Sequence, residues 1–133
     1  MTEDEDLFQA FEAVLAVPEL RETTFQTAGG GGAARPFKVI GQEPDAVLIK
    51  TSRGGTVSLR AEAFAAALKV LRDLAPDDPQ GWVRTGDETL VAVLQAENRD
   101  KACSSYVLPL LAAAGRIELD RGRPSRARIP RSG

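Results

Sequence analysis

The stretch DETLVAVLQAENRDKACSSYVLPLLAAAGRIELDRGRPSRARIP, residues 87–130, has the pattern of helix, turn, helix, strand, basic turn and second strand. In its first part Leu90, Val93 and Leu94 recur at i, i+3 and i+4. This spacing places them on one side of a helix, so we predict a helix over residues 88–96.

Two features mark the start of this helix. Asp87 stands just before it, where a carboxylate can accept hydrogen bonds from the free N–H groups of the first turn. Thr85 and Glu88 lie three residues apart, which is the spacing of a capping box.

A second apolar stripe falls within residues 100–114. Its members are Cys103, Val107, Leu110, Leu111 and Ala114. Pro109 would cost about 3 kcal/mol inside a helix, because it removes a hydrogen bond and clashes with the preceding turn. We therefore predict that the continuous helix starts only at Ser104 or Ser105, which leaves Pro109 in or just past the first turn. Gly115 is expected to end it, since a left-handed terminating residue is cheapest without a Cβ atom.

The end of the stretch has the pattern of a β-hairpin. Residues 116–120 alternate polar and apolar side chains, as a half-buried strand does. Residues 121–124 form a basic turn, and a second alternating run follows at 126–129.

This order resembles a winged helix-turn-helix domain, in which the last two helices are followed by a two-stranded wing. The motif YVLPLLAAAGRIEL followed by RGRPSRARI looks like the end of a recognition helix and its wing. The resemblance covers about a third of the chain, or about half if a helix near Leu68 is the first of the three. Trp82 and Val83 fit the strand that such domains carry between their first two helices. The resemblance is to the fold, and it implies DNA binding.

The N-terminal half is expected to hold one helix and a small sheet. An amphipathic helix precedes Pro18, and its apolar residues are Leu7, Phe8, Phe11, Val14 and Leu15. This helix either packs on its own domain or serves as a dimerisation or partner helix. Three β-prone runs (37–40, 46–49 and 56–59) predict a three-stranded meander, with strand-like residues also at 23–27. The glycine run at 29–32 is expected to be a surface loop.

A further helix is expected over residues 60–74, with Ser58 as its cap. The fold class is therefore α+β: an N-terminal helix and small antiparallel sheet, followed by a C-terminal winged helix-turn-helix. We place the boundary between residues 1–58 and residues 59–133.

Charge is distributed unevenly along the chain. The net charge is −2, but residues 1–22 carry −6 and residues 116–133 carry +4. Long-range attraction to nucleic acid is therefore weak, and binding has to be local to a basic surface. The single cysteine, Cys103, excludes an internal disulfide, and its place on the apolar stripe indicates packing. No apolar run could span a bilayer, so we expect a soluble, cytoplasmic protein with no membrane contact.

The sequence gives no support for an enzyme. It has no histidine, which is the commonest general base and metal ligand, and one cysteine cannot build a thiolate zinc site. The acidic clusters at residues 3–6 and 77–78 are contiguous, whereas a two-metal site needs acids from separate elements. We expect no catalytic residues, no metal and no cofactor.

The arginine-rich end is the strongest functional signal. Guanidinium groups pair with phosphates and guanine edges, and a hairpin tip can carry them into a groove. The turn before the second helix and the polar side of that helix are where a recognition helix meets DNA. The candidate DNA-binding residues are Arg99, Lys101, Ser104, Ser105, Arg121, Arg123, Arg126 and Arg128. Leu108 is also expected to face the groove.

We therefore expect a non-enzymatic DNA-binding protein, regulatory or architectural, that binds duplex DNA and forms a homodimer through its N-terminal helix. Because Pro109 shortens the reading helix, backbone and shape recognition are favoured over strong sequence specificity. The alternative is a protein–protein interaction module of a larger complex, using the same scaffold and the acidic, apolar-faced N-terminal helix. In that case the basic hairpin docks on a protein or is an inert tail.

Overall fold

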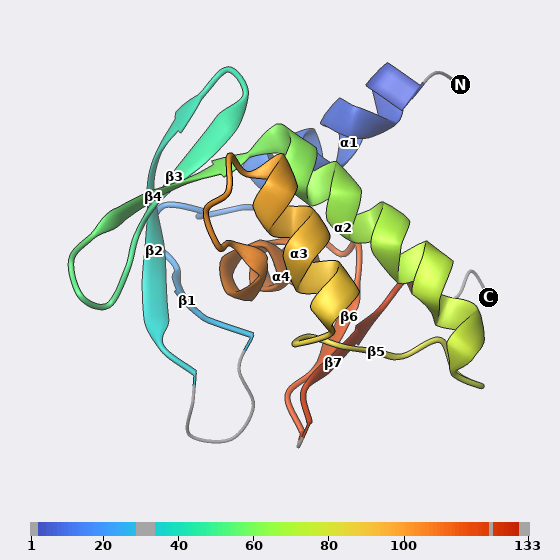
Figure 1. Cartoon of the computed structure of the whole chain (residues 1–133). Coiled ribbons are helices and arrows are strands. Elements are labelled where there is room, and N and C mark those ends of the chain that lie inside the picture. The colour runs from blue at the N-terminus through green and yellow to red at the C-terminus, as the bar shows by residue number, and fades with distance from the viewer. Residues whose placement is uncertain (1–2, 29–33, 123, 131–133) are drawn as a thin grey trace.

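The computed structural model describes residues 3–28, 34–122 and 124–130. The fold is α+β, as predicted, with an N-terminal helix and two antiparallel sheets (Figure 1). In chain order the elements are α1 (Glu3–Leu15), β1 (Thr24–Gln26), β2 (Pro36–Glu43), β3 (Ala46–Lys50), β4 (Thr56–Arg60), α2 (Ala61–Leu74), the 3-10 helix η2 (Ala75–Asp77), β5 (Val83–Arg84), α3 (Glu88–Glu97), α4 (Ser104–Ala113), β6 (Glu118–Asp120) and β7 (Arg126–Arg128). The predicted glycine loop at 29–32 lies outside the described residues.

Sheet A is a meander of four strands in the order β1-β2-β3-β4. The three predicted strands are confirmed, and β1 adds a fourth at the edge. Phe37 and Val39 are buried while Lys38 and Ile40 are exposed, so one face of the sheet packs on the core and the other is open. A β-bulge at Ile40 shifts the register between β2 and β3.

Sheet B has three strands in the order β5-β7-β6, and β6 and β7 form the predicted hairpin. From α2 onward the elements therefore follow each other as helix, strand, helix, helix, strand, strand. Gly115 ends α4 as predicted: its φ of 75° is in the left-handed region, and the next N–H, of Arg116, donates to the carbonyl of Leu111 at 2.9 Å.

Helix α4 lies in the middle of the molecule, between sheet A on one side and α2 and α3 on the other (Figure 1). Val107, Leu108 and Leu110 are completely buried, and the ring of Tyr106 meets the ring of Phe37 edge-on at 5.2 Å. The prediction that Leu108 faces outward was wrong. Leu108 is buried together with the predicted apolar stripe, and the sequence pattern of one helix cannot show a second packing partner.

The late start of α4 is confirmed, because the helix begins at Ser104. Pro109 has no N–H group, so the carbonyl of Ser105 lacks the donor that residue i+4 normally supplies. The backbone N–H of Ala28 takes that place, at 2.9 Å. The cost of a buried proline in α4 is thus offset by a hydrogen bond from the segment that follows β1.

Helix α1 packs its apolar face on its own chain. Ala10, Phe11 and Val14 are buried, and the rings of Phe11 and Phe64 are 6.1 Å apart. The structure shows the first of the two expected roles of this helix, which is packing on its own domain. Among the described residues, Phe8 remains exposed at 39 %.

One predicted helix cap is confirmed and two were wrong. Asp87 accepts a hydrogen bond from the N–H of Leu90 at 3.1 Å. The hydroxyl of Thr85 instead bonds that of Ser125, because the pairing of β5 with β7 brings these residues together. Helix α2 begins at Ala61, too late for Ser58 to cap it.

The start of α2 is instead held by a residue distant in sequence. Asn98 is 2 % exposed, and its Oδ1 atom accepts the N–H of Arg60 at 2.8 Å. Its Nδ2 atom donates to the carbonyl of Lys101 at 3.3 Å. Asn98 therefore joins the α3–α4 turn to the junction of β4 and α2.

One hydrophobic core includes residues from both predicted segments, such as Val47 and Ile49 of sheet A and Leu90 and Leu111 of the helices. The proposed boundary after residue 58 falls inside β4. Among the described residues, no helix is long and apolar enough to cross a membrane.

We expect Asn98→Ala to lower the free energy of unfolding by about 2 kcal/mol, because the buried N–H of Arg60 loses its acceptor. Chemical denaturation measures this. The control is Gln95→Ala, which also removes a bond to this turn but at an exposed site, and should cost less than about 1 kcal/mol. Equal losses in the two variants would contradict the role given to Asn98.

Candidate nucleic-acid interface

Two of the predicted arginines, Arg126 and Arg128, are engaged within the hairpin. They lie two residues apart on β7, and both guanidinium groups stack on Trp82, with Cζ 4.7 and 4.3 Å from the ring centroid. Arg126 also pairs with Asp120 at 2.6 Å, and Arg128 pairs with Glu118 at 2.8 Å. Each of these guanidinium groups therefore uses part of its hydrogen-bonding capacity within the protein.

The strand register explains these ion pairs. Glu118 is directly opposite Arg128, and Asp120 is directly opposite Arg126. Opposite charges at facing positions of an antiparallel pair stabilise it by about 0.2–1 kcal/mol. The arginines on β7 therefore stabilise the hairpin.

Arg121 is fixed differently. Its Nη1 atom donates to the carbonyl of Thr27 at 2.6 Å, and its Nη2 atom to the carbonyl of Gln26 at 3.0 Å. It thereby ties the hairpin turn to the end of β1, although the residue itself remains exposed. Arg123 lies outside the described residues.

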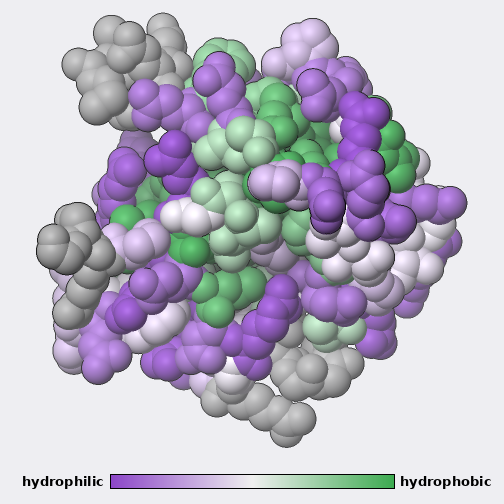
Figure 2. Space-filling model, turned by 180° about the vertical axis from the view of Figure 1, so that it is seen from behind, coloured by the Kyte–Doolittle hydropathy of each residue, from purple (hydrophilic) through white to green (hydrophobic). Residues whose placement is uncertain are grey.

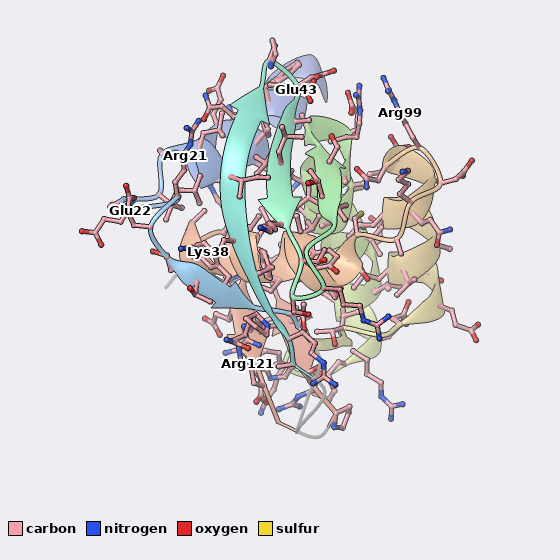
Figure 3. All side chains as sticks on the ribbon, turned by 90° about the vertical axis from the view of Figure 1, so that its left-hand side faces the viewer. Arg21, Glu22, Lys38, Glu43, Arg99 and Arg121 are labelled. Carbon is pink, nitrogen blue, oxygen red and sulfur yellow. The ribbon has the colours of Figure 1, made fainter. Side chains whose placement is uncertain are left out.

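The α3–α4 turn presents Arg99 and Lys101 to solvent. Arg99 and Asp100 have φ values of 56° and 62°, which is unusual for side chains with a Cβ atom. Figure 3 shows Arg99 near one end of the molecule and Arg121 toward the other. Arg99 and Arg121 therefore do not belong to one cluster.

Ser104 and Ser105, at the start of α4, are half-buried. Residues 107–111, in the middle of α4, are all buried, so few side chains of this helix are available to bases in a major groove. DNA contact by these serines stays a prediction.

The structure brings together a basic surface that the sequence analysis missed. Lys38 on β2 and Lys50 on β3 are directly opposite each other on the open face of sheet A (Figure 3). Both are exposed, and in the described part of the chain neither belongs to an ion pair. Arg53, in the turn that follows β3, is exposed as well. Alternation in residues 37–40 could have placed Lys38 on the polar side, whereas the apolar run at 46–49 gives no such signal for Lys50. Only the register shows that the two lysines face each other.

Charge is segregated across the molecule. Residues 24–60 carry five basic and two acidic side chains, and one of those acids, Asp45, pairs with Arg60 at 2.7 Å. In Figure 1 the N-terminal helix α1 lies at the end of the molecule where β2 turns into β3, away from the β3–β4 turn that carries Arg53. Seen from behind, hydrophobic side chains occupy the middle of the surface and polar ones surround them (Figure 2).

The described ionisable groups show no arrangement typical of catalysis. Burial raises the pKa of the Cys103 thiol to about 12, and this cysteine packs in the core as predicted. Among the residues the structure describes, no group of three or more His, Cys, Asp or Glu side chains could hold a metal ion.

We found no match to a protein-family model, to a curated protein or to a solved structure. The functional argument therefore rests on the surface of this chain alone.

Two carboxylates hold Trp82 and the arginines in place. The N–H groups of Trp82 and Gln80 donate to Asp78 at 3.0 and 2.9 Å, and they lower the pKa of that carboxyl. The hydrogen bond from Arg126, with the N–H of Gly122, lowers the pKa of Asp120.

These lowered pKa values predict acid sensitivity. A carboxyl whose pKa is depressed in the folded state contributes its stability above the ordinary value of 3.8 and loses it as the pH falls toward the folded value. Asp120→Asn should therefore flatten the fall of the melting temperature below pH 4. Arg126→Gln should do the same, since it removes the main cause of the shift. If the melting temperature of both variants fell below pH 4 as steeply as that of the wild type, the contribution of the Asp120–Arg126 pair to acid sensitivity would be contradicted.

Proposed function

We propose that this chain is a non-enzymatic DNA-binding protein, regulatory or architectural, that holds duplex DNA by its phosphates on the open face of sheet A. The observation that carries the proposal is the facing pair of Lys38 and Lys50, with Arg53 in the adjoining turn. Facing like charges destabilise a sheet, so this pair costs stability in the free protein. A polyanion bound across both strands would offset that cost.

The arrangement of the C-terminal half supports a winged-helix origin for the scaffold. In a winged helix, the strand between the first two helices pairs with the last strand of the wing. The element order and the strand order β5-β7-β6 agree with this arrangement, with β5 as that strand and β6 and β7 as the wing. In this order α4 is the third helix, and sheet A packs against it through β1. The proposed binding is therefore to the phosphate backbone, with little direct reading of bases.

Screening by salt allows this surface to bind a polyanion although the chain is acidic overall. Residues 1–22 carry −6. Over a Debye length of about 8 Å in physiological salt, the repulsion between phosphates and more distant acidic groups is largely screened. A chain of net charge −2 can then bind a polyanion locally.

Salt dependence tests the proposal. If Lys38, Lys50 and Arg53 each neutralise one phosphate, the logarithm of the duplex binding constant should fall against the logarithm of salt with a slope of about −2.7. The Lys38→Ser, Lys50→Ser double variant should reduce the slope to about −0.9. The matched control is Lys101→Ser, which removes an exposed lysine outside sheet A and should leave the slope unchanged. A slope that responds to Lys101 and not to Lys38 and Lys50 would refute the proposed surface.

A single substitution should separate binding from stability. Lys50→Glu places opposite charges across β2 and β3, and we expect it to raise the free energy of unfolding by about 0.5 kcal/mol. The same change should weaken duplex binding more than removal of the lysine charge alone, because the new carboxylate repels phosphate. Denaturation and binding titrations on this variant measure both effects. Binding that is kept or improved would count against DNA as the ligand.

The second candidate is a protein-interaction module, which the apolar area on the rear of the molecule favours (Figure 2). Its discriminating test is affinity purification with nuclease treatment. A stoichiometric protein that survives nuclease, together with no duplex binding at low salt, would favour this function over DNA binding.

A further inference from the structure

A trough of about 480 Å³ runs over the outward side of α2, between α1 and the end of α3. Its floor includes Ala65 and Ala66, which are half-buried. In Figure 1, α2 crosses the front of the molecule with this side uncovered. Small side chains here would let another helix approach closely, at the 8–10 Å axis separation typical of packed helices.

The charges along the trough have a definite order. Glu62 lies in the first turn of α2, and Lys69 and Arg72 lie seven and ten residues further along. Glu97 lines the same trough from α3, and its neighbour Asn98 bonds the N–H of Arg60 where α2 begins. One end of the trough is therefore acidic, and the other is basic.

Part of this order suits α2 by itself, because acids near the start of a helix and bases near its end complement the helix dipole. Glu97 is not explained in that way, since it comes from another helix and adds to the acidic end. In the described part of the chain, Lys69 and Arg72 form no ion pairs, so their charges are available to a partner.

We propose that a second copy of this chain occupies the trough, with the two α2 helices antiparallel about a two-fold axis. If the axis passes between Ala65 and Ala66, Ala65 of one copy faces Ala66 of the other. The same register sets Glu62 of each copy opposite Lys69 of the other copy. Arg72 then extends toward the acidic end formed by Glu62 and Glu97 of the second copy. The charge pattern is self-complementary, as a two-fold interface requires.

In this proposal the homodimer forms through α2 and not, as expected from the sequence, through α1. The apolar face of α1 is used within the chain, where Ala10, Phe11 and Val14 are buried. The α2 surface is open and small, so the dimer should form at micromolar concentrations and exchange rapidly. The inference does not depend on the DNA proposal, because α2 and the lysines of sheet A are separate surfaces.

Sedimentation of the full chain over about two decades of micromolar concentration tests the proposal. The wild type should shift from monomer to dimer. Glu62→Lys alone and Lys69→Glu alone should each weaken the dimer by about tenfold or more, because each sets like charges opposite one another. The control Lys50→Glu changes an exposed lysine outside the trough and should dimerise as the wild type does.

Charge exchange gives the decisive comparison. In the proposed register, mixing the Glu62→Lys protein with the Lys69→Glu protein restores opposite charges at both positions, so the mixture should form a heterodimer. The variant that carries both changes should dimerise with itself. Circular dichroism verifies that each variant is folded, and the lost contact between Glu62 and Arg60 is partly exposed and should cost little. A monomeric wild type, or single variants that dimerise unchanged, would overturn the proposal, as would a folded mixture that stays monomeric.

Discussion

The contact between α4 and the segment after β1 is the constraint on which the arrangement depends. Pro109 leaves the carbonyl of Ser105 without its usual intrahelical donor, and the N–H of Ala28 supplies one at 2.9 Å. An unsatisfied carbonyl buried at this position would cost about 1–3 kcal/mol. The bond therefore fixes where sheet A meets the helices, and with it the burial of α4.

Burial of α4 determines which charges remain available to a ligand. The hairpin that looks like a wing is attached to sheet A by Arg121, and its other described arginines are held by Asp120, Glu118 and Trp82. Guanidinium groups suit such roles because their donors are planar and they stack on aromatic rings. Within residues 3–28, 34–122 and 124–130, the lysines of sheet A and α2 form no ion pairs, and both proposed interfaces depend on lysine.

The α3–α4 turn shows how closely the two halves of the chain are joined. Asn98 is buried and holds the start of α2, while the two residues after it adopt left-handed backbone conformations. Such conformations cost about 1–3 kcal/mol each and persist only where the surroundings enforce them. The network of Asn98 provides that enforcement and leaves Arg99 and Lys101 at the surface.

Local patterns in the sequence determined the elements: the helices and strands, the cap at Asp87, the late start of α4 and the end at Gly115 all follow from neighbours within a few residues. Alternation within residues 37–40 could also have placed Lys38 on a polar side. Only the tertiary structure decided that β1 joins the sheet, that Leu108 is buried and that Lys38 and Lys50 face each other. It also paired the hairpin arginines and gave Asn98 and Ser125 their partners. The reason is that these contacts join residues distant in the chain, whereas periodicity and capping report only on near neighbours.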